Sequence, residues 1–169
     1  MMLNTIYFGD SVYTKEGAFF KPTEVILNNV VSIVSLNISG GLNDKECVLV
    51  LSLVDDLKLL DQAAKREIRL SYENKNSIVA SFIHEHFKDY TEEITQQIFD
   101  HLGIKKQDDL VFIDRLKLGS VSIYNDKNTG LCITLDYNIL WDEGIPFTDQ
   151  ILAVRFDSEK RFLSVAHES

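Results

Sequence analysis

Cysteine is scarce in this chain of 169 residues. Cys47 and Cys132 are far apart in the sequence, each within an apolar segment, and neither has a second cysteine at the spacing of a metal or redox motif. We therefore expect both to be buried structural thiols in a reducing compartment. The alternative is a reactive nucleophile.

Proline and long apolar runs are scarce too. The two prolines form no linker, and the sequence contains no internal repeat or low-complexity tract, so we predict a single domain over residues 1–169. The longest nearly apolar run, Cys47 to Val54, is far shorter than the ~20 residues that a membrane-spanning helix needs. The first residues also lack the pattern of a secretory leader. These absences predict a cytoplasmic protein that does not associate with membranes.

Positive charge is in the minority and is not clustered. The chain has 17 lysines and arginines against 26 aspartates and glutamates, which gives a net charge of −9. No basic run is longer than Lys65-Arg66 or Lys105-Lys106, and because phosphate backbones favour clustered cations, we predict no nucleic acid ligand. Acidic pairs, in contrast, recur at Asp55-Asp56, Glu92-Glu93, Asp108-Asp109 and Asp142-Glu143. They either form solvated surfaces and helix starts or steer the protein toward a basic partner protein.

The common catalytic and phosphate-binding motifs are missing. The sequence has no Gly-x-Ser-x-Gly and no glycine-rich loop ending in Lys-Ser or Lys-Thr, and Gly40-Gly41 lacks the spacing of a dinucleotide fingerprint. We therefore predict no cofactor and assign no catalytic residue.

Two segments have some features of metal sites. On a helix, the imidazoles of His84-Glu85-His86 point about 200° apart, so they cannot bind one ion; we expect His84 to point outward and His86 to pack inward. Residues Asp126 to Gly130 begin like a calcium loop, but Leu131 and Tyr137 stand where the loop requires glycine and a bidentate glutamate. We predict a hairpin turn there and no metal site.

Strand patterns occupy the first part of the chain, residues 3–39. Ile6 to Phe8 and Glu24 to Leu27 are predicted strands. Asn28-Asn29 is predicted to close a hairpin into Val30 to Ile38, because asparagine tolerates positive φ. This last strand has apolar residues on both sides near the turn, so we expect it to be partly covered on both faces.

Strand patterns return in residues 118–169. Gly119-Ser120 predicts a strand start or a bulge, because the apolar residues before and after it are out of phase. Over residues 131–139 apolar and polar side chains alternate strictly, which predicts a strand with one buried face.

The intervening residues, 43 to about 116, predict four to five helices. Asn43 followed by Glu46 resembles a capping box, which favours a helix over a buried strand in the apolar run that follows. Further helices are indicated by apolar residues at four-residue spacing from Leu60 to Tyr72, by a cap at Thr91 and by a stop at Gly103. The order of these blocks predicts an α+β fold: an antiparallel sheet built from the N-terminal and C-terminal strands and packed on one face by the helices.

Three segments carry a resemblance to a known family. They are Leu-Asn-Thr-Ile-Tyr-Phe-Gly-Asp at residues 3–10, Val54 to Lys65, and Val154 to Ser169. Together they resemble an uncharacterised bacterial family described only as a domain of unknown function. The resemblance spans nearly the whole chain and implies a bacterial origin and a single-domain fold, with no catalytic residues to carry over.

One loop is the best candidate for recognition. Residues 139–147 hold the only tryptophan, Trp141, together with Asp142, Glu143 and Phe147. Aromatic side chains surrounded by charge are typical of interfaces. The alternative is a loop that folds Trp141 and Phe147 over the end of the core, and the exposure of Trp141 distinguishes the two.

These observations favour a non-catalytic, acidic protein-interaction domain, either immunity-like or regulatory, that binds a more basic protein. The alternative is an enzyme, possibly a hydrolase, with an unfamiliar site of carboxylates or His86. That alternative requires a concave pocket with converging polar groups. The oligomeric state does not follow from the sequence.

Overall fold

The computed structural model describes residues 1–74, 76–88, 91–105, 108–140 and 146–169, and the side chain of His86 also lies outside the described set. Within these residues the chain forms eight strands and five helices. The strands are β1 (Met2–Thr5), β2 (Gly9–Val12), β3 (Gly17–Leu27), β4 (Val30–Ser39), β5 (Lys117–Asp126), β6 (Gly130–Asn138), β7 (Ile151–Asp157) and β8 (Phe162–Glu168). The helices are α1 (Asp44–Asp55), α2 (Leu57–Tyr72), α3 (Ile78–Lys88), α4 (Glu92–Leu102) and α5 (Asp109–Arg115).

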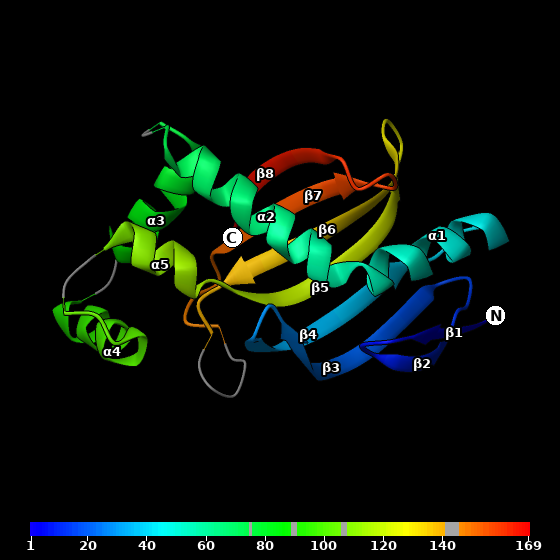
Figure 1. Ribbon diagram of the computed structural model, residues 1–169, viewed down its shortest axis with the longest axis horizontal. Coiled ribbons are helices and arrows are strands. Elements are labelled where there is room, and N and C mark those ends of the chain that lie inside the picture. Colours follow the sequence, from blue (N-terminus) through cyan, green and yellow to red (C-terminus); the bar gives the residue numbers. More distant parts are fainter. Residues whose placement is uncertain (75, 89–90, 106–107, 141–145) are drawn as a thin grey trace.

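A six-stranded sheet in the order β3-β4-β5-β6-β7-β8 forms the centre of the molecule (Figure 1). Neighbouring strands are antiparallel except β4 and β5, which pair in parallel. In the sequence, all five helices lie between β4 and β5. Such a long connection allows the chain to enter β5 in the same direction as β4. The predicted α+β class and the sheet of N-terminal and C-terminal strands are confirmed. We expected antiparallel pairing throughout, and this one junction differs.

The beginning of the chain forms a hairpin outside this sheet. β1 and β2 pair only with each other. The strand that we predicted at Ile6 to Phe8 is wrong, because these residues form the turn between β1 and β2. Tyr7 and Phe8 pack against the core, and the ring centroid of Phe8 lies 6.1 Å from that of Phe20. Their apolar character therefore reflects burial of a turn.

Local signals at turns and helix ends are confirmed. Asn28 and Asn29 have φ values of 53° and 66° and close the β3–β4 hairpin. Asn43 and Glu46 form the capping box of α1, in which the Asn43 side chain accepts from two backbone N–H groups and Glu46 accepts from the Asn43 N–H. Gly103 ends α4 with a φ of 70°. Each of these signals acts within a few residues, which is why the sequence alone indicates them.

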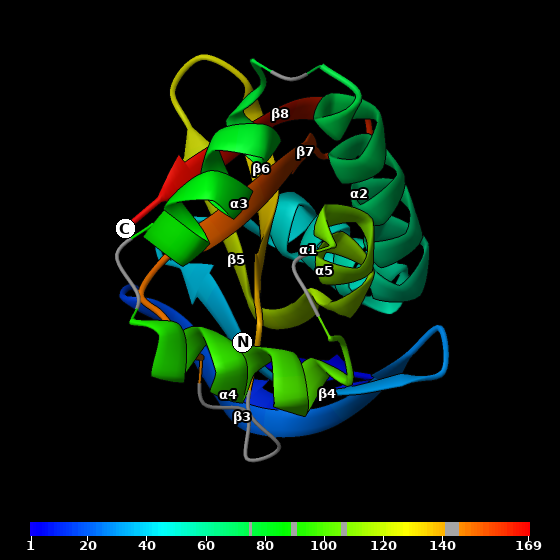
Figure 2. The ribbon, with the colours of Figure 1, turned by 90° about the vertical axis from the view of Figure 1, so that its left-hand side faces the viewer.

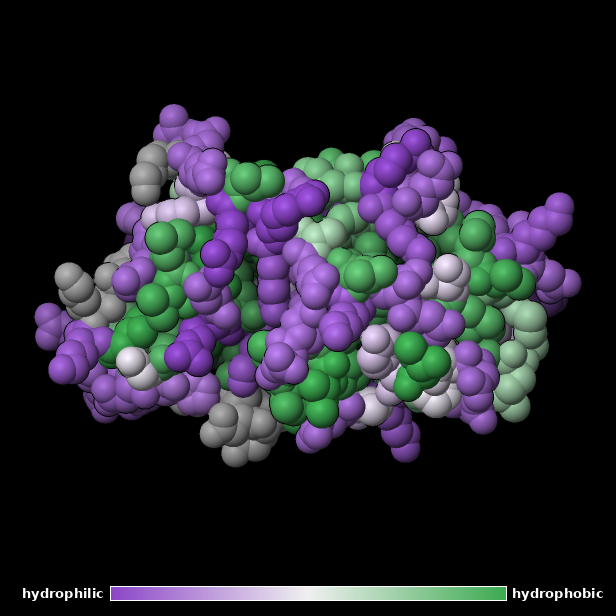
Figure 3. Space-filling model, viewed as in Figure 1, coloured by the Kyte–Doolittle hydropathy of each residue, from purple (hydrophilic) through white to green (hydrophobic). Residues whose placement is uncertain are grey.

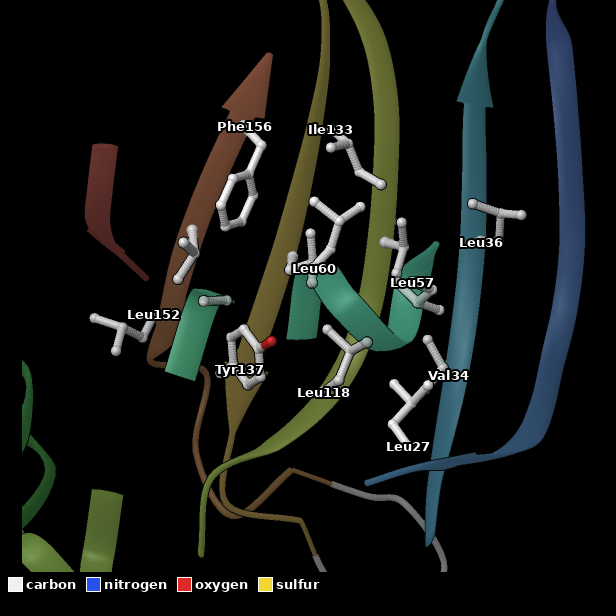
Figure 4. Close-up of a cluster of buried hydrophobic side chains, with 14 of the residues drawn as sticks. Leu27, Val34, Leu36, Leu57, Leu60, Leu118, Ile133, Tyr137, Leu152 and Phe156 are labelled. Atoms are coloured by element: carbon white, nitrogen blue, oxygen red, sulfur yellow. The ribbon is translucent and has the colours of Figure 1, made fainter. Parts of the chain in front are cut away.

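The helices cover one face of the sheet, with α2 running across it (Figures 1 and 2). On this side Leu57 and Leu60 of α2 lie opposite Leu118 and Tyr137 of the sheet (Figure 4). All four are buried, and each leucine stabilises the fold by about 1.5–3 kcal/mol. The outer side of α2 is largely polar (Figure 3). The alternation predicted for residues 131–139 thus places its apolar side chains under the helices.

The opposite face of the sheet carries no helix among the described residues. There Phe19, Ile26 and Val31 are 60%, 61% and 48% exposed. The expectation that residues 30–38 are partly covered on both faces is therefore met only in part, because on this face Val31 is exposed while Ile33 is half-buried. Mostly antiparallel sheets tolerate one face in water, because their connections need not cross that face.

Both cysteines, Cys47 and Cys132, are free and buried, as expected.

A buried carboxylate joins α2 to the sheet. Asp61 is 1% exposed, and its Oδ1 accepts the hydroxyl hydrogen of Tyr137 at 2.9 Å. Its Oδ2 accepts from Asn28 Nδ2 at 2.8 Å and lies 3.3 Å from the ammonium of Lys65. Burial, followed by the charge of Asp61, raises the pKa of Tyr137, so the phenol stays a donor. One side chain thus connects α2, the β3–β4 turn and β6.

We expect Tyr137→Phe to lower the free energy of unfolding by about 1–3 kcal/mol, because it removes a donor from a buried carboxylate. Urea denaturation at pH 7 measures the change. Tyr7→Phe is the matched control, since the Tyr7 hydroxyl has no hydrogen-bond partner in the part of the chain that is described. An equal loss of unfolding free energy in both variants would show that the Tyr137–Asp61 hydrogen bond adds no stability of its own.

Candidate functional site

A cavity of about 220 Å³ opens at the end of β6, on the face of the sheet that the described helices leave bare. Ser120 of β5 and Asp136 of β6 are direct neighbours in the sheet and supply its polar floor. Its apolar walls are Leu140, Pro146 and Ile151, and Asp149 lies at its edge in the sequence that leads into β7. We call this cavity the Asp136 pocket.

Irregular backbone at the ends of β5 and β6 shapes the pocket. The pairing of β5 with β6 shifts between Leu118 and Ser120, so of the two alternatives predicted for Gly119-Ser120 the bulge is confirmed, while β5 already begins at Lys117. A Cβ built on Gly119 would meet the Leu140 side chain at 3.8 Å, an ordinary contact. The absence of a side chain at this position therefore leaves space beside Leu140 without being required by the fold.

The segment after residue 145 is tied back to the end of β6. The Asn138 side chain donates from Nδ2 to the carbonyl of Thr148 at 2.8 Å and accepts from the Ile139 N–H at 2.7 Å. The Phe147 N–H donates to the Ile139 carbonyl at 3.0 Å. These bonds hold Pro146 and Thr148 against the strand and so build one wall of the pocket.

Asp136 is a carboxylate with one hydrogen bond and no cation. The Ser120 hydroxyl donates to its Oδ2 at 2.5 Å, and within the described residues no lysine or arginine lies within ion-pair distance. Burial raises the pKa of Asp136 above its ordinary value of 3.8; the Ser120 bond opposes this rise, and the charge of Glu168 adds to it. The carboxylate is thus desolvated and only partly compensated.

Other charged groups on this face lie around the pocket. Lys117 is opposite Asn138, one step beyond Asp136 along the strand pair. Arg155 of β7 is opposite Thr134, and its guanidinium lies 5.6 Å from the ring centroid of Tyr124. Glu168 of β8 is opposite Ile151. The nearest elements therefore surround Asp136 with charges of both signs.

The sequence predicted a recognition site in the neighbouring loop, residues 139–147. Trp141, Asp142 and Glu143 lie outside the described residues, so the exposure of Trp141 stays untested. Phe147 is half-buried and meets the ring of His101 on α4 at 5.2 Å in an edge-to-face contact. Phe147 also packs against the hydrophobic core.

Sequence reasoning missed Asp136 as a candidate. Its signal was present: the polar face of residues 131–139 contains a carboxylate in mid-strand, where aspartate is disfavoured. Among the histidines, His84 is exposed as expected, while the side chain of His86 is outside the described set. Among the residues that the structure covers, no three His, Cys, Asp or Glu side chains gather as metal ligands.

Comparison with known proteins adds no relatives. No family model matches the chain, and no curated protein and no solved structure is found to be similar to it. The resemblance to a bacterial family of unknown function therefore stays a prediction. No described helix is long and apolar enough to cross a membrane.

The size and chemistry of the Asp136 pocket limit what it can bind. Pockets for drug-sized ligands measure about 300–1,000 Å³, whereas this one has about 220 Å³. One side chain, or a molecule of similar size, matches it better than a nucleotide or an oligosaccharide does. Ser120 has a carboxylate beside it, but none of the described residues that line the pocket offers an imidazole as the base of a hydrolytic triad.

We expect Asp136→Asn to keep or raise the free energy of unfolding at pH 7. The raised pKa means that folding disfavours the ionised carboxylate, so this penalty is present at neutral pH. It shrinks as the pH falls through the raised pKa and is lost below 3.8, where the carboxyl becomes protonated in both the folded and the unfolded state. Chemical denaturation of both proteins between pH 3.5 and 7.5 tests this, and a variant that loses stability mainly at pH 7 would contradict it.

Proposed function

We propose that the protein is a non-catalytic binding domain, immunity-like or regulatory, that recognises a basic protein through the end of the sheet around the Asp136 pocket. The observation that carries this proposal is a desolvated carboxylate without a cation in a cavity of side-chain size. A partner that brings a positive charge to this place offsets the desolvation.

The charge of the chain supports the same partner. At a net charge of −9 the protein attracts basic surfaces over long distances. Asp149 lines the pocket, and Glu168 is opposite Ile151, which lines it too, so both place negative charge near Asp136. Attraction of this kind raises the association rate and selects against acidic partners.

The bare face of the sheet supplies further contact area. A stable protein interface buries about 800 Å² on each partner, which one small pocket cannot provide. The same face also carries exposed Phe19, Ile26 and Val31 on β3 and β4. Apolar side chains beside a charged pocket give an interface both area and orientation.

The compartment is part of the proposal. Two free, buried thiols fit the reducing interior of a cell, so we place the protein in the cytoplasm.

A hydrolase is the second candidate, and one observation favours it. Asp136 and Asp149 line the same cavity, and the raised pKa of Asp136 is the property of a general acid. Turnover of ester, glycoside or phosphate substrates that is lost in both Asp136→Asn and Asp149→Asn would support the hydrolase and contradict the binding domain.

Charge reversal near the pocket tests the binding function. The immobilised chain is used to isolate a partner from its own host, and the dissociation constant is then measured with both proteins purified. We expect a basic partner, and we expect Asp149→Lys and Glu168→Lys each to weaken binding about 10-fold or more, or about 1.4 kcal/mol. The loss should appear largely in the association rate and shrink at high salt, because it is electrostatic.

Asp55→Lys is the control for that experiment. Asp55 is exposed at the end of α1, its side chain makes no hydrogen bond or ion pair with other described residues, and its reversal changes the net charge by the same amount. We expect an effect of no more than about twofold, less than 0.5 kcal/mol. An equal loss in all three variants, or an acidic partner, would contradict the proposed interface.

A further inference from the structure

We propose that the Asp136 pocket receives a single lysine or arginine side chain of the partner, with its aliphatic part between Leu140, Pro146 and Ile151 and its charged end at Asp136. This inference rests on the proposed function and names the group by which the partner is recognised.

The shape of the pocket matches a long cationic side chain. Its apolar walls, Leu140, Pro146 and Ile151, stand beside a polar floor formed by Ser120 and Asp136. Lysine and arginine have the same division, because an apolar stem carries a charged head. The stem gains burial against the walls while the head reaches the carboxylate, so a single side chain satisfies both parts of the cavity.

The electrostatics disfavour acidic and apolar side chains. An acidic group would meet Asp136, Asp149 and Glu168, which carry the same charge. An apolar group would displace water from Asp136 and leave the carboxylate without compensation, which costs several kcal/mol for an ion. Only a cation replaces the lost hydration by an ion pair.

Asp136 retains capacity to accept a further donor. Its Oδ2 already accepts from Ser120, and no hydrogen bond to Oδ1 from another described residue is present. Arg155 and Lys117 on the same sheet face form no ion pair with Asp136: Arg155 lies over the Tyr124 ring, and Lys117 stands opposite Asn138. The carboxylate is therefore open to a cation from outside the chain.

Binding of a cation is linked to pH. The ionised form of Asp136 is the one that pairs, so a bound cation lowers the raised pKa and binding releases a proton in the window between the two values. Asp149 and Glu168 from neighbouring segments, together with Lys117 and Arg155, set the field in which this titration occurs. Affinity should therefore fall as the pH drops through the raised pKa.

Small probes test the pocket on the full-length chain without the partner. Chemical shifts of backbone amides are followed by NMR while n-butylammonium or n-butylguanidinium is added, with n-butanol and butyrate as neutral and anionic probes. We expect the cations to shift the amides of Gly119, Ser120 and Asp136 with a dissociation constant of the order of 1 mM, about −4 kcal/mol. Butanol and butyrate should bind at least about 10-fold more weakly.

Variants assign the effect to the carboxylate. Asp136→Asn should weaken cation binding about 10-fold and abolish its pH dependence, and Gly119→Ala should weaken it by adding a methyl group beside Leu140. Glu24→Gln is the matched control, since Glu24 is exposed on the same sheet face, on β3. The spectrum of each variant shows directly whether it is folded, and Gly119→Ala serves as a second test if Asp136→Asn is not.

Two results would overturn the inference. One is butanol binding as well as the cations, and the other is unchanged cation binding in Asp136→Asn or Gly119→Ala. If the probes fail while Asp149→Lys and Glu168→Lys still weaken partner binding, the pocket assignment falls and the proposed function stands. If the probes bind as expected but no basic partner depends on Asp149 and Glu168, the proposed function falls instead.

Discussion

Tyr137 and Asp61 meet at the point where the helices lie on the sheet. The contact is buried, and the carboxylate receives three partners that come from β6, from the β3–β4 turn and from α2 itself. A buried ion left without such partners costs several kcal/mol, so α2 has one favourable position along the sheet. The helical block begins with α1 and α2, and the position of α2 therefore determines where the rest of the crossover can return to β5.

The strand that carries Tyr137 also carries a carboxylate whose surroundings differ from those of Asp61. Asp136 precedes Tyr137 and, by the alternation of a strand, points to the other face. Asp61, on the face of α2 that meets the sheet, has an amide, a phenol and an ammonium around it, whereas among the described residues Asp136 has the Ser120 hydroxyl alone. A desolvated carboxylate thus lies on each side of β6, Asp61 from α2 on one side and Asp136 from the strand itself on the other, and only Asp61 is fully compensated.

The predictable and unpredictable parts of the structure differ in the range of the interactions that create them. The Asn28-Asn29 turn, the Asn43–Glu46 capping box and the Gly103 stop depend on neighbouring residues, and the sequence predicts all three. The strand prediction at Tyr7 and Phe8 was wrong because these residues are apolar for a different reason. They lie in a turn whose Phe8 ring packs against Phe20 in the folded protein. The parallel pairing of β4 with β5 likewise depends on how a long crossover returns, which no local pattern encodes.

The candidate site combines both kinds of information. The Gly119 bulge could be predicted from the phase of the surrounding apolar residues, but the convergence of Asp136 with Leu140 and Ile151 depends on three-dimensional pairing. The sequence prediction selected the adjoining loop with Trp141, because exposed aromatic residues are the usual sign of an interface. An unpaired carboxylate is a different sign: it destabilises the folded chain at neutral pH, and a protein retains such a group where another function compensates for the loss. The desolvation of Asp136 is therefore more informative about function than the apolar alternation of β6, which the core alone explains.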